Sequence, residues 1–331
     1  IAGCSDGDTS VLGNPVAFEM PASAEATGPR LSSTKNGGLV LSWMERHDDG
    51  TALVYAPLVD GTLRAPREVV VDARMFVNWA DLPSVMQLEG DHWVAHWLRY
   101  SADLVYSYDV VVSQSFDGGR KWSMPVSVHD DGTPTEHGFV SMHTAADGVG
   151  LLWLDGRDTA KEPTDNRLDT SMTLRAATIA PNGTVIAEQR VDDAVCDCCQ
   201  TDVAVAGDTP VAVYRDRTAG EIRDIYVTRY IGGAWSAGTR LHADDWVISG
   251  CPVNGPSIVA RGEDVAVAWF SAARDTPVVR VTRSSDGGRS FDAPIEVAAG
   301  RLAGYVGLAA LPDGSLAVSW VERTDTGKNE L

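Results

Sequence analysis

One kind of strand, centred on a large aromatic side chain, recurs six times along the sequence. Examples are LVLSWMER, which ends at Arg46, WVAHWLRY, which ends at Tyr100, and LAVSWVER near the C-terminus. The central aromatic residues lie 51 to 61 positions apart, and they are Trp43, Trp97, Trp153, Tyr214, Trp269 and Trp320. This spacing is typical of the four-stranded blades of β-propellers. The sequence therefore predicts an all-β, six-bladed β-propeller with four strands in each blade.

The segments between these strands support the same fold. Short apolar strands precede the aromatic strand, as in GFVSMHT from Gly138, and alternating strands follow it, as in YDVVVSQS from Tyr108. No segment shows a helical period. The sixth repeat stops at Leu331, about where a third strand would begin, and PVAFEMPA from Pro15 has the pattern of an outer strand. We therefore expect a single propeller domain over residues 15–331, with the N-terminal strand closing the ring.

A turn motif occurs twice at the same position of the repeat. It reads SFDGGRKW over Ser115–Trp122 and SSDGGRSF over Ser284–Phe291. Both copies resemble the Asp box of sialidase-like propellers, in which a tight hairpin joins the third and fourth strands. In such a hairpin, Asp117 and Asp286 accept backbone hydrogen bonds and the glycines adopt positive φ. The resemblance implies a sialidase-like propeller, with these turns on the side away from the ligand.

Composition restricts the classes of partner. The formal net charge is −19 and the pI is near 4.6, so the chain would repel nucleic-acid phosphates and anionic lipid surfaces. No apolar run reaches the roughly 18 to 20 residues that a spanning helix needs. We expect no nucleic-acid partner and no membrane-spanning segment, and we expect a monomer.

The first ten residues, IAGCSDGDTS, resemble the end of a bacterial lipoprotein signal. The resemblance implies that Cys4 is lipidated, that residues 1–3 are signal remnant, and that the rest of residues 1–14 is a tether. The expected location is the bacterial periplasm or cell surface, with membrane attachment only through the lipid on Cys4.

Loops leading into the innermost strands of a propeller meet near its axis. Residues about 50 positions apart in sequence can therefore form one site at the central face, for a small-molecule, metal or glycan ligand. The candidate residues in these loops are Arg30, Trp79, Asp81, Glu136, His137, Cys196, Cys198, Cys199, Gln200, Asp202, Cys251, Asn254 and Tyr305.

The leading hypothesis rests on the segment CDCCQTD, which places three of the five cysteines within four positions. Such clustering is unusual for core cysteines and indicates a metal or redox site. Thiolates favour copper(I) or zinc(II), and imidazole suits both ions. The expected ligands are Cys196, Cys198, Cys199, Cys251 and His137.

The alternative follows from the sialidase resemblance. It implies that Arg30 binds a substrate carboxylate, that Asp81 acts as acid and base, and that Tyr305 is the nucleophile. Glu136 is a further catalytic candidate, and the predicted ligand-binding residues are Trp79, Gln200, Asp202 and Asn254. The chain departs from the family where an arginine triad is needed, because the loops of the fourth and fifth repeats offer cysteine, glutamine and asparagine instead.

A third interpretation is structural. In an exported protein the four remaining cysteines can form two disulfides, and three pairings stay open. The protein would then be a disulfide-stabilised scaffold without catalysis. The other histidines, His129 among them, are expected to be ordinary solvated or hydrogen-bonded residues.

Overall fold

The computed structural model describes residues 20–34, 37–162, 167–324 and 329–331. Within them the strands form six separate antiparallel sheets that follow one another along the chain. Three short 3-10 helices accompany them, namely η1 (Arg157–Ala160), η2 (Arg167–Thr170) and η3 (Ala273–Asp275). No helix among the described residues is long and apolar enough to cross a membrane.

The first three sheets occupy the N-terminal half of the chain. The first contains β1 (Thr27–Ser33), β2 (Leu39–His47), β3 (Gly50–Val59), β4 (Thr62–Leu63) and β5 (Arg67–Asp72). The second contains β6 (Ser84–Gln87), β7 (Trp93–Tyr100), β8 (Tyr108–Ser115) and β9 (Val126–Ser127). The third contains β10 (His137–Ala145), β11 (Gly148–Asp155), β12 (Thr173–Ile179) and β13 (Val185–Asp192).

The last three sheets repeat this order. The fourth contains β14 (Asp202–Ala206), β15 (Thr209–Arg215), β16 (Ile225–Ile231), β17 (Ala234–Trp235) and β18 (Thr239–Arg240). The fifth contains β19 (Ser257–Arg261), β20 (Asp264–Ser271), β21 (Val278–Ser284) and β22 (Ile295–Ala299). The sixth contains β23 (Leu302–Ala310), β24 (Leu316–Arg323) and β25 (Asn329–Glu330).

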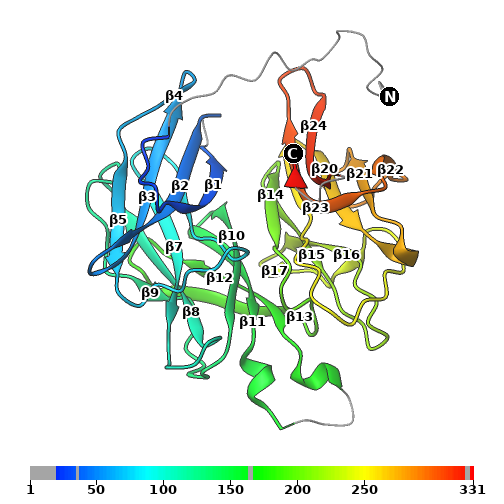
Figure 1. Cartoon of the computed structure of the whole chain (residues 1–331), viewed down its shortest axis with the longest axis horizontal. Helices are drawn as coiled ribbons and strands as arrows, with labels where there is room; N and C mark the ends of the chain where they lie inside the picture. The colour runs from blue at the N-terminus through cyan, green and yellow to red at the C-terminus, as the bar shows by residue number, and fades with distance from the viewer. Residues whose placement is uncertain (1–19, 35–36, 163–166, 325–328) are drawn as a thin grey trace.

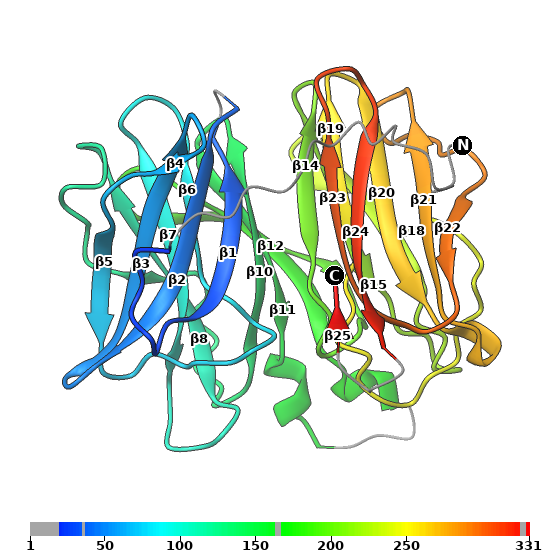
Figure 2. The same ribbon diagram turned by 45° about the horizontal axis from the view of Figure 1, so that its top comes forward.

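Consecutive sheets pack against each other through their first strands. Strand β1 contacts β6, β10 contacts β7 and β14, and β19 contacts both β14 and β23. Figures 1 and 2 show the sheets following one another from blue, through green, to red. The all-β architecture of four-stranded antiparallel sheets is confirmed. The N-terminal strand expected from Pro15 lies mostly outside the described residues, and residues 20–22 form no strand.

The repeated aromatic residues all lie on the second strand of their sheet, and each donates a hydrogen bond to a carboxylate. The pairs are Trp43 with Glu45 (2.7 Å), Trp97 with Asp72 (2.9 Å), Trp153 with Asp155 (2.8 Å), Tyr214 with Asp192 (2.5 Å), Trp269 with Asp244 (2.7 Å) and Trp320 with Glu322 (2.9 Å). Burying an aromatic ring contributes large apolar area, but its N–H or O–H needs a partner. The carboxylate supplies that partner in every repeat.

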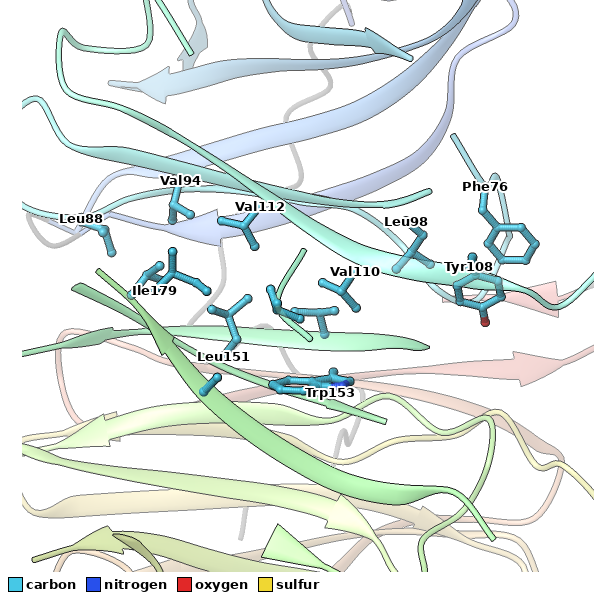
Figure 3. Packing of buried hydrophobic residues seen from close by; sticks show 14 residues of the cluster. Phe76, Leu88, Val94, Leu98, Tyr108, Val110, Val112, Leu151, Trp153 and Ile179 are labelled. Atoms are coloured by element: carbon cyan, nitrogen blue, oxygen red, sulfur yellow. The ribbon is translucent and has the colours of Figure 1, made fainter. Parts of the chain in front are cut away.

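Apolar side chains fill the space between neighbouring sheets. Between the second and third sheets, Val110 and Val112 of β8 face Leu151 and Trp153 of β11 (Figure 3). These four side chains are at most 1% exposed. Alternate residues of a strand point to opposite faces, so the period-two pattern of the sequence places one set in each such layer.

Both Asp-box turns have the expected hydrogen bonds. In the first, Asp117 Oδ1 accepts the backbone N–H groups of Arg120 and Lys121 at 3.0 and 2.9 Å. In the second, Asp286 Oδ1 accepts those of residues 289 and 290 at 2.9 and 3.0 Å. The paired glycines of each turn have φ between 70° and 77°. The motif is therefore structural in this chain.

Candidate functional site

Side-chain hydrogen bonds connect the loops that lead into the first strands. Gln200, in the loop before β14, donates from Nε2 to the carbonyl oxygen of Ala80 at 2.9 Å. Its Oε1 accepts the N–H of Gly255, before β19, at 3.1 Å. Arg30 on β1 donates to the carbonyl oxygen of Leu82 at 3.3 Å. Loops of the second, fourth and fifth sheets therefore meet at one face of the molecule.

Asp81 and Asn254 make equivalent contacts at this face. Asp81 accepts the N–H of Phe139 through both carboxylate oxygens at 2.8 Å, and Asn254 Oδ1 accepts the N–H of Tyr305 at 2.6 Å. Phe139 and Tyr305 have φ of 54° and 55°, and each follows a glycine. A non-glycine residue with positive φ is uncommon and needs support from its surroundings. The two polar side chains hold these strained backbones across the junction between sheets.

Burial changes the ionisation of Asp81. The side chain is 2% exposed, and burial together with the nearby charge of Glu136 raises its pKa to about 7, against the N–H of Phe139 and the charge of Arg30. Both of its oxygens are used inside the protein. Asp81 therefore lies beneath the surface of the site and acts as a structural acceptor in this conformation.

Glu136 forms a short hydrogen bond with a buried tyrosine. Its Oε1 accepts from the hydroxyl of Tyr108 at 2.5 Å. Burial raises the pKa of Glu136, with a further contribution from the charge of Asp197. Glu136 is a partly desolvated carboxyl group at the edge of the third sheet, one residue before β10.

Asp202 is the next buried carboxylate in the same region. Its Oδ2 accepts the N–H of Ile258 at 2.9 Å, and its Oδ1 accepts the N–H of Val203 at 2.9 Å. Burial raises the pKa of Asp202, whereas burial lowers the pKa of Arg30, whose charge interacts with Asp202 and Asp81. Arg30 is thus an interior cation between two carboxyl groups.

Two aromatic side chains are exposed at this face. Trp79, in the loop before β6, is 66% exposed, and Tyr305 on β23 is 42% exposed. Their rings meet edge to face with centroids 6.3 Å apart. Residues from the second and sixth sheets therefore form one exposed aromatic pair.

The cysteines form a compact cluster beside these loops. The Sγ atoms of Cys196, Cys198 and Cys199 all lie within 4.8 Å of one another. The Cys251 thiol, from the loop before β19, interacts with that of Cys198, which lowers the pKa of Cys251. The Cys196 and Cys199 sulfurs are 2.8 Å apart, too long for the roughly 2.05 Å disulfide bond. All four cysteines within the described residues are free thiols, so neither predicted disulfide is present.

Arginines surround the buried end of this cluster. Arg223 Nη1 lies 3.4 Å from Cys196 Sγ, and Arg217 pairs with Asp197 at 3.1 Å. Although burial opposes ionisation, hydrogen bonds from neighbouring thiols and the charge of Arg215 lower the pKa of Cys196 well below its usual value. Hydrogen bonds to the other three thiols raise the pKa of Cys198. One thiolate, stabilised by guanidinium groups, is the expected state of the cluster.

The sequence analysis did not identify Arg215 and Arg223 as site residues. Both are 2% exposed; Arg215 is the last residue of β15, the second strand of the fourth sheet, and Arg223 lies in the loop between β15 and β16. Arg223 also binds Glu221 at 3.0 Å, and Arg215 donates only to backbone carbonyl groups among its hydrogen bonds. The guanidinium groups of both arginines are buried and bonded to other groups of the protein, so they do not form a substrate-binding triad with Arg30.

His137 lies elsewhere than the thiol hypothesis places it. Its ring stacks on His129 with centroids 3.8 Å apart, and its Nε2 is 3.2 Å from Asp131 Oδ2. His129 is hydrogen-bonded as expected, through Nδ1 to Asp131 at 2.8 Å, but it is buried and its Nε2 has no hydrogen-bond partner among the described residues.

No protein-family model matches this sequence, and no curated protein matches it as a relative. Among solved structures, an ulvan lyase of polysaccharide lyase family PL25 is 12% identical with a TM-score of 0.50, covering 89% of this chain and 76% of its own. The Hadza microbial sialidase Hz136 is 16% identical with a TM-score of 0.48, and this chain spans 61% of its length. A mutant of Trypanosoma rangeli sialidase is 12% identical with a TM-score of 0.49, covering 92% of this chain and 53% of its own.

At these identities the likeness concerns the fold. The likeness to the ulvan lyase, with a TM-score of 0.50, supports the fold alone, and the two turns have the hydrogen bonds expected of Asp boxes. The activity of this chain has to be argued from its own residues.

Proposed function

We propose that the protein binds a soft metal ion, copper(I) or zinc(II), through the thiolates of Cys196, Cys198, Cys199 and Cys251. The observation that carries this proposal is the approach of three sulfurs from one loop to within 4.8 Å of one another. A fourth thiol, Cys251 from the loop before β19, interacts with that of Cys198. Thiolates are the ligands that select copper(I) and zinc. A bound ion would hold the two loops together and would offer redox chemistry only if it is copper.

The surrounding charges suit this role. Binding requires deprotonated sulfurs, and several adjacent thiolates repel one another unless cations are near. Arg223, beside Cys196, and Arg215, behind it, supply positive charge without competing for the sulfurs' outer side. Cys251 is exposed, so it gives an ion a route into the cluster.

Metal content and thiol reactivity test the proposal together. Protein isolated without chelators or reductant is expected to contain about one equivalent of copper or zinc and to show metal-protected thiols. Cys251→Ser removes the exposed ligand and should reduce affinity at least tenfold, because even loss of an outer partner of a metal ligand costs 10–100-fold. Ser249→Ala, in the same loop, should bind normally.

Two outcomes would contradict metal binding. One is wild-type protein that takes up neither zinc(II) nor copper(I) while its four thiols remain titratable. The other is protein with no titratable thiol and no metal, which would establish disulfides and the scaffold interpretation.

Glycan binding is the second candidate function, and the exposed pair of Trp79 and Tyr305 favours it. Aromatic faces present apolar surface to sugar rings, and both solved sialidases and the ulvan lyase with similar folds act on glycans by their names. Asp81 is buried with both oxygens hydrogen-bonded to Phe139, and the partly exposed Arg30 and Glu136 make hydrogen bonds to Leu82 and Tyr108. Asp81 would therefore act on a ligand only after rearrangement. Binding, rather than hydrolysis, is the form that this geometry supports.

Screening acidic and neutral oligosaccharides against wild type and Trp79→Ala measures this function. Loss of the ring should weaken a true ligand about tenfold, corresponding to about 1.4 kcal/mol of aromatic contact. Phe116→Ala removes another exposed aromatic, 52% exposed and part of the first Asp-box turn, and should change nothing. Equal binding by Trp79→Ala and wild type would exclude this face.

The finer architecture is also part of this proposal. Six blades closed into a ring by the segment from Pro15, and a lipidated Cys4 in an exported protein, fit the repeat count and the N-terminal sequence. Mass spectrometry of Cys4 in the exported protein distinguishes a lipid-linked from an unmodified cysteine.

A further inference from the structure

A second cluster of metal-binding side chains lies in the third sheet and its preceding loop, apart from the cysteines. His129, which follows β9, stacks on His137, the first residue of β10, with the ring planes 17° apart. Their side chains are 3% and 0% exposed. Stacked, buried imidazoles are unusual because each needs partners for two ring nitrogens.

Asp131 faces one edge of both rings. Its Oδ2 is 2.8 Å from His129 Nδ1 and 3.2 Å from His137 Nε2. The other oxygen of Asp131 accepts the backbone N–H of Thr133 at 3.0 Å, and Arg157 lies 3.5 Å from Oδ2. These contacts fix the Asp131 carboxylate beside both rings, where it hydrogen bonds with His129 Nδ1.

The opposite edge carries the other nitrogen of each ring. His129 Nε2 and His137 Nδ1 lie 3.9 and 3.7 Å from the same atom, Asp109 Oδ1. The carbonyl oxygen of Tyr108 is 3.2 Å from His137 Nδ1. His129 Nε2 is buried without a hydrogen-bond partner among the described residues, as is His137 Nε2. An ion bound at this edge would supply the partner that His129 Nε2 lacks, and it would replace the hydrogen bond between His137 Nδ1 and the Tyr108 carbonyl.

The spacing suits a divalent ion. His129, His137 and Asp109 each place one donor atom within 4.8 Å of the other two. Bonds of about 2.0 to 2.1 Å in a tetrahedral site put ligand atoms roughly 3.4 Å apart. The 3.9 and 3.7 Å separations of the ring nitrogens from Asp109 Oδ1 would therefore need to close by roughly half an ångström or less. Asp109 is 31% exposed, which leaves the ion a path from solvent and a position for water.

We propose that His129 Nε2, His137 Nδ1 and Asp109 Oδ1 form a zinc-type site for a borderline divalent cation, with Asp131 orienting both imidazoles. Imidazole and carboxylate together favour zinc, cobalt or nickel over magnesium or calcium, which prefer oxygen alone. A carboxylate behind a metal-binding histidine fixes the tautomer in many such sites. This site is independent of the thiol cluster, because it contains no sulfur.

Cobalt(II) titration of the full chain separates the two sites. Thiolate ligands give cobalt(II) intense near-ultraviolet charge-transfer absorption, whereas nitrogen and oxygen ligands give only weak visible bands. Wild type should show a weak-band site that persists in Cys251→Ser. The variant Asp109→Asn should still fold, because Asp109 is partly exposed. It should lose the weak-band site, with at least a tenfold fall in affinity for cobalt(II) or zinc(II).

Two further variants sharpen the test. Asp131→Asn touches no metal in this proposal but loses the orienting carboxylate, so its affinity should fall about 10–100-fold. Asp103→Asn, an exposed carboxylate in the loop before β8, should bind as wild type does. The proposal would be overturned if Asp109→Asn bound cobalt(II) and zinc(II) as tightly as wild type does. It would also be overturned if wild type had no sulfur-free site, in which case a shared proton satisfies the cluster.

Discussion

Replacing Arg215 with methionine is expected to lower the free energy of unfolding by about 3 to 5 kcal/mol. The guanidinium is 2% exposed and donates four hydrogen bonds. Nε and Nη2 reach the carbonyl oxygen of Asn254 at 3.0 and 2.9 Å, Nη2 also reaches that of Phe270 at 2.8 Å, and Nη1 reaches that of Arg223 at 2.6 Å. Methionine fills part of the volume but leaves three buried carbonyl groups without this donor, each at a cost of about 1 to 3 kcal/mol.

Denaturation with urea at neutral pH measures the change. Arg261→Met is the matched control, because Arg261 also donates to a backbone carbonyl, that of Pro312 at 2.8 Å, but from an exposed position. Its effect should stay within about 0.5 kcal/mol. If Arg215→Met unfolds at the same urea concentration as wild type, the guanidinium does not connect the fourth and fifth sheets.

The same substitution bears on the thiol site. The charge of Arg215 is among the causes that lower the pKa of Cys196. If the Arg215→Met variant folds, its Cys196 should react more slowly with a thiol reagent at neutral pH than Cys196 of wild type, because a smaller fraction of it is thiolate. Arg215→Lys keeps a charge but not the forked donor, so it should recover more reactivity than stability.

The substitution Asp81→Asn is expected to remove a loss of stability that wild type suffers at alkaline pH. Relative to wild type, the free energy of unfolding of the variant should be about 3 kcal/mol more favourable above pH 7 than it is at pH 5. Burial raises the pKa of Asp81 to about 7 in the folded protein, whereas the unfolded chain releases this proton near pH 4. The folded state therefore binds the extra proton between these values. Stability from this group is complete below about pH 4, falls by about 1.4 kcal/mol per pH unit as pH rises, and is lost once pH passes 7.

Asparagine should be well tolerated at this position. Its carboxamide oxygen can still accept the N–H of Phe139, and the chain already uses Asn254 for the equivalent contact with Tyr305. Unfolding at pH 5 and pH 8 should differ less in the variant than in wild type. The exposed Asp60→Asn serves as control, and an identical pH dependence in Asp81→Asn and wild type would contradict the buried carboxyl. If a glycan-cleaving activity is found, its survival in Asp81→Asn would also exclude Asp81 as its acid and base.

The site contacts that the sequence predicted are those between residues close together in the chain or at equivalent positions of the repeat. Cys196, Cys198 and Cys199 belong to one loop, so their proximity was predictable from the sequence. The repeat register predicted that Cys251, whose thiol interacts with that of Cys198, lies near this loop. The placement of His137 among thiols was not supported, because its partners, Asp131 and Asp109, come from the turn before it and from β8.

Sequence alone determined the architecture because its signals are local and repeated. Period-two apolar patterns, the spacing of the aromatic residues and the two Asp boxes each specify strands and turns within a few residues. The carboxylates that accept hydrogen bonds from the repeated aromatic residues add the polar contact that a buried indole requires.

Only the tertiary structure decided which side chains meet and which stay accessible. Asp81 looks like a catalytic acid in sequence, yet both its oxygens are used by Phe139, and Arg215 and Arg223 become the cations of the thiol cluster. Such contacts join residues 8 to 58 positions apart. These contacts depend on the packing angle between sheets, on side-chain rotamers and on the desolvation of polar groups. The local sequence pattern predicts none of these quantities.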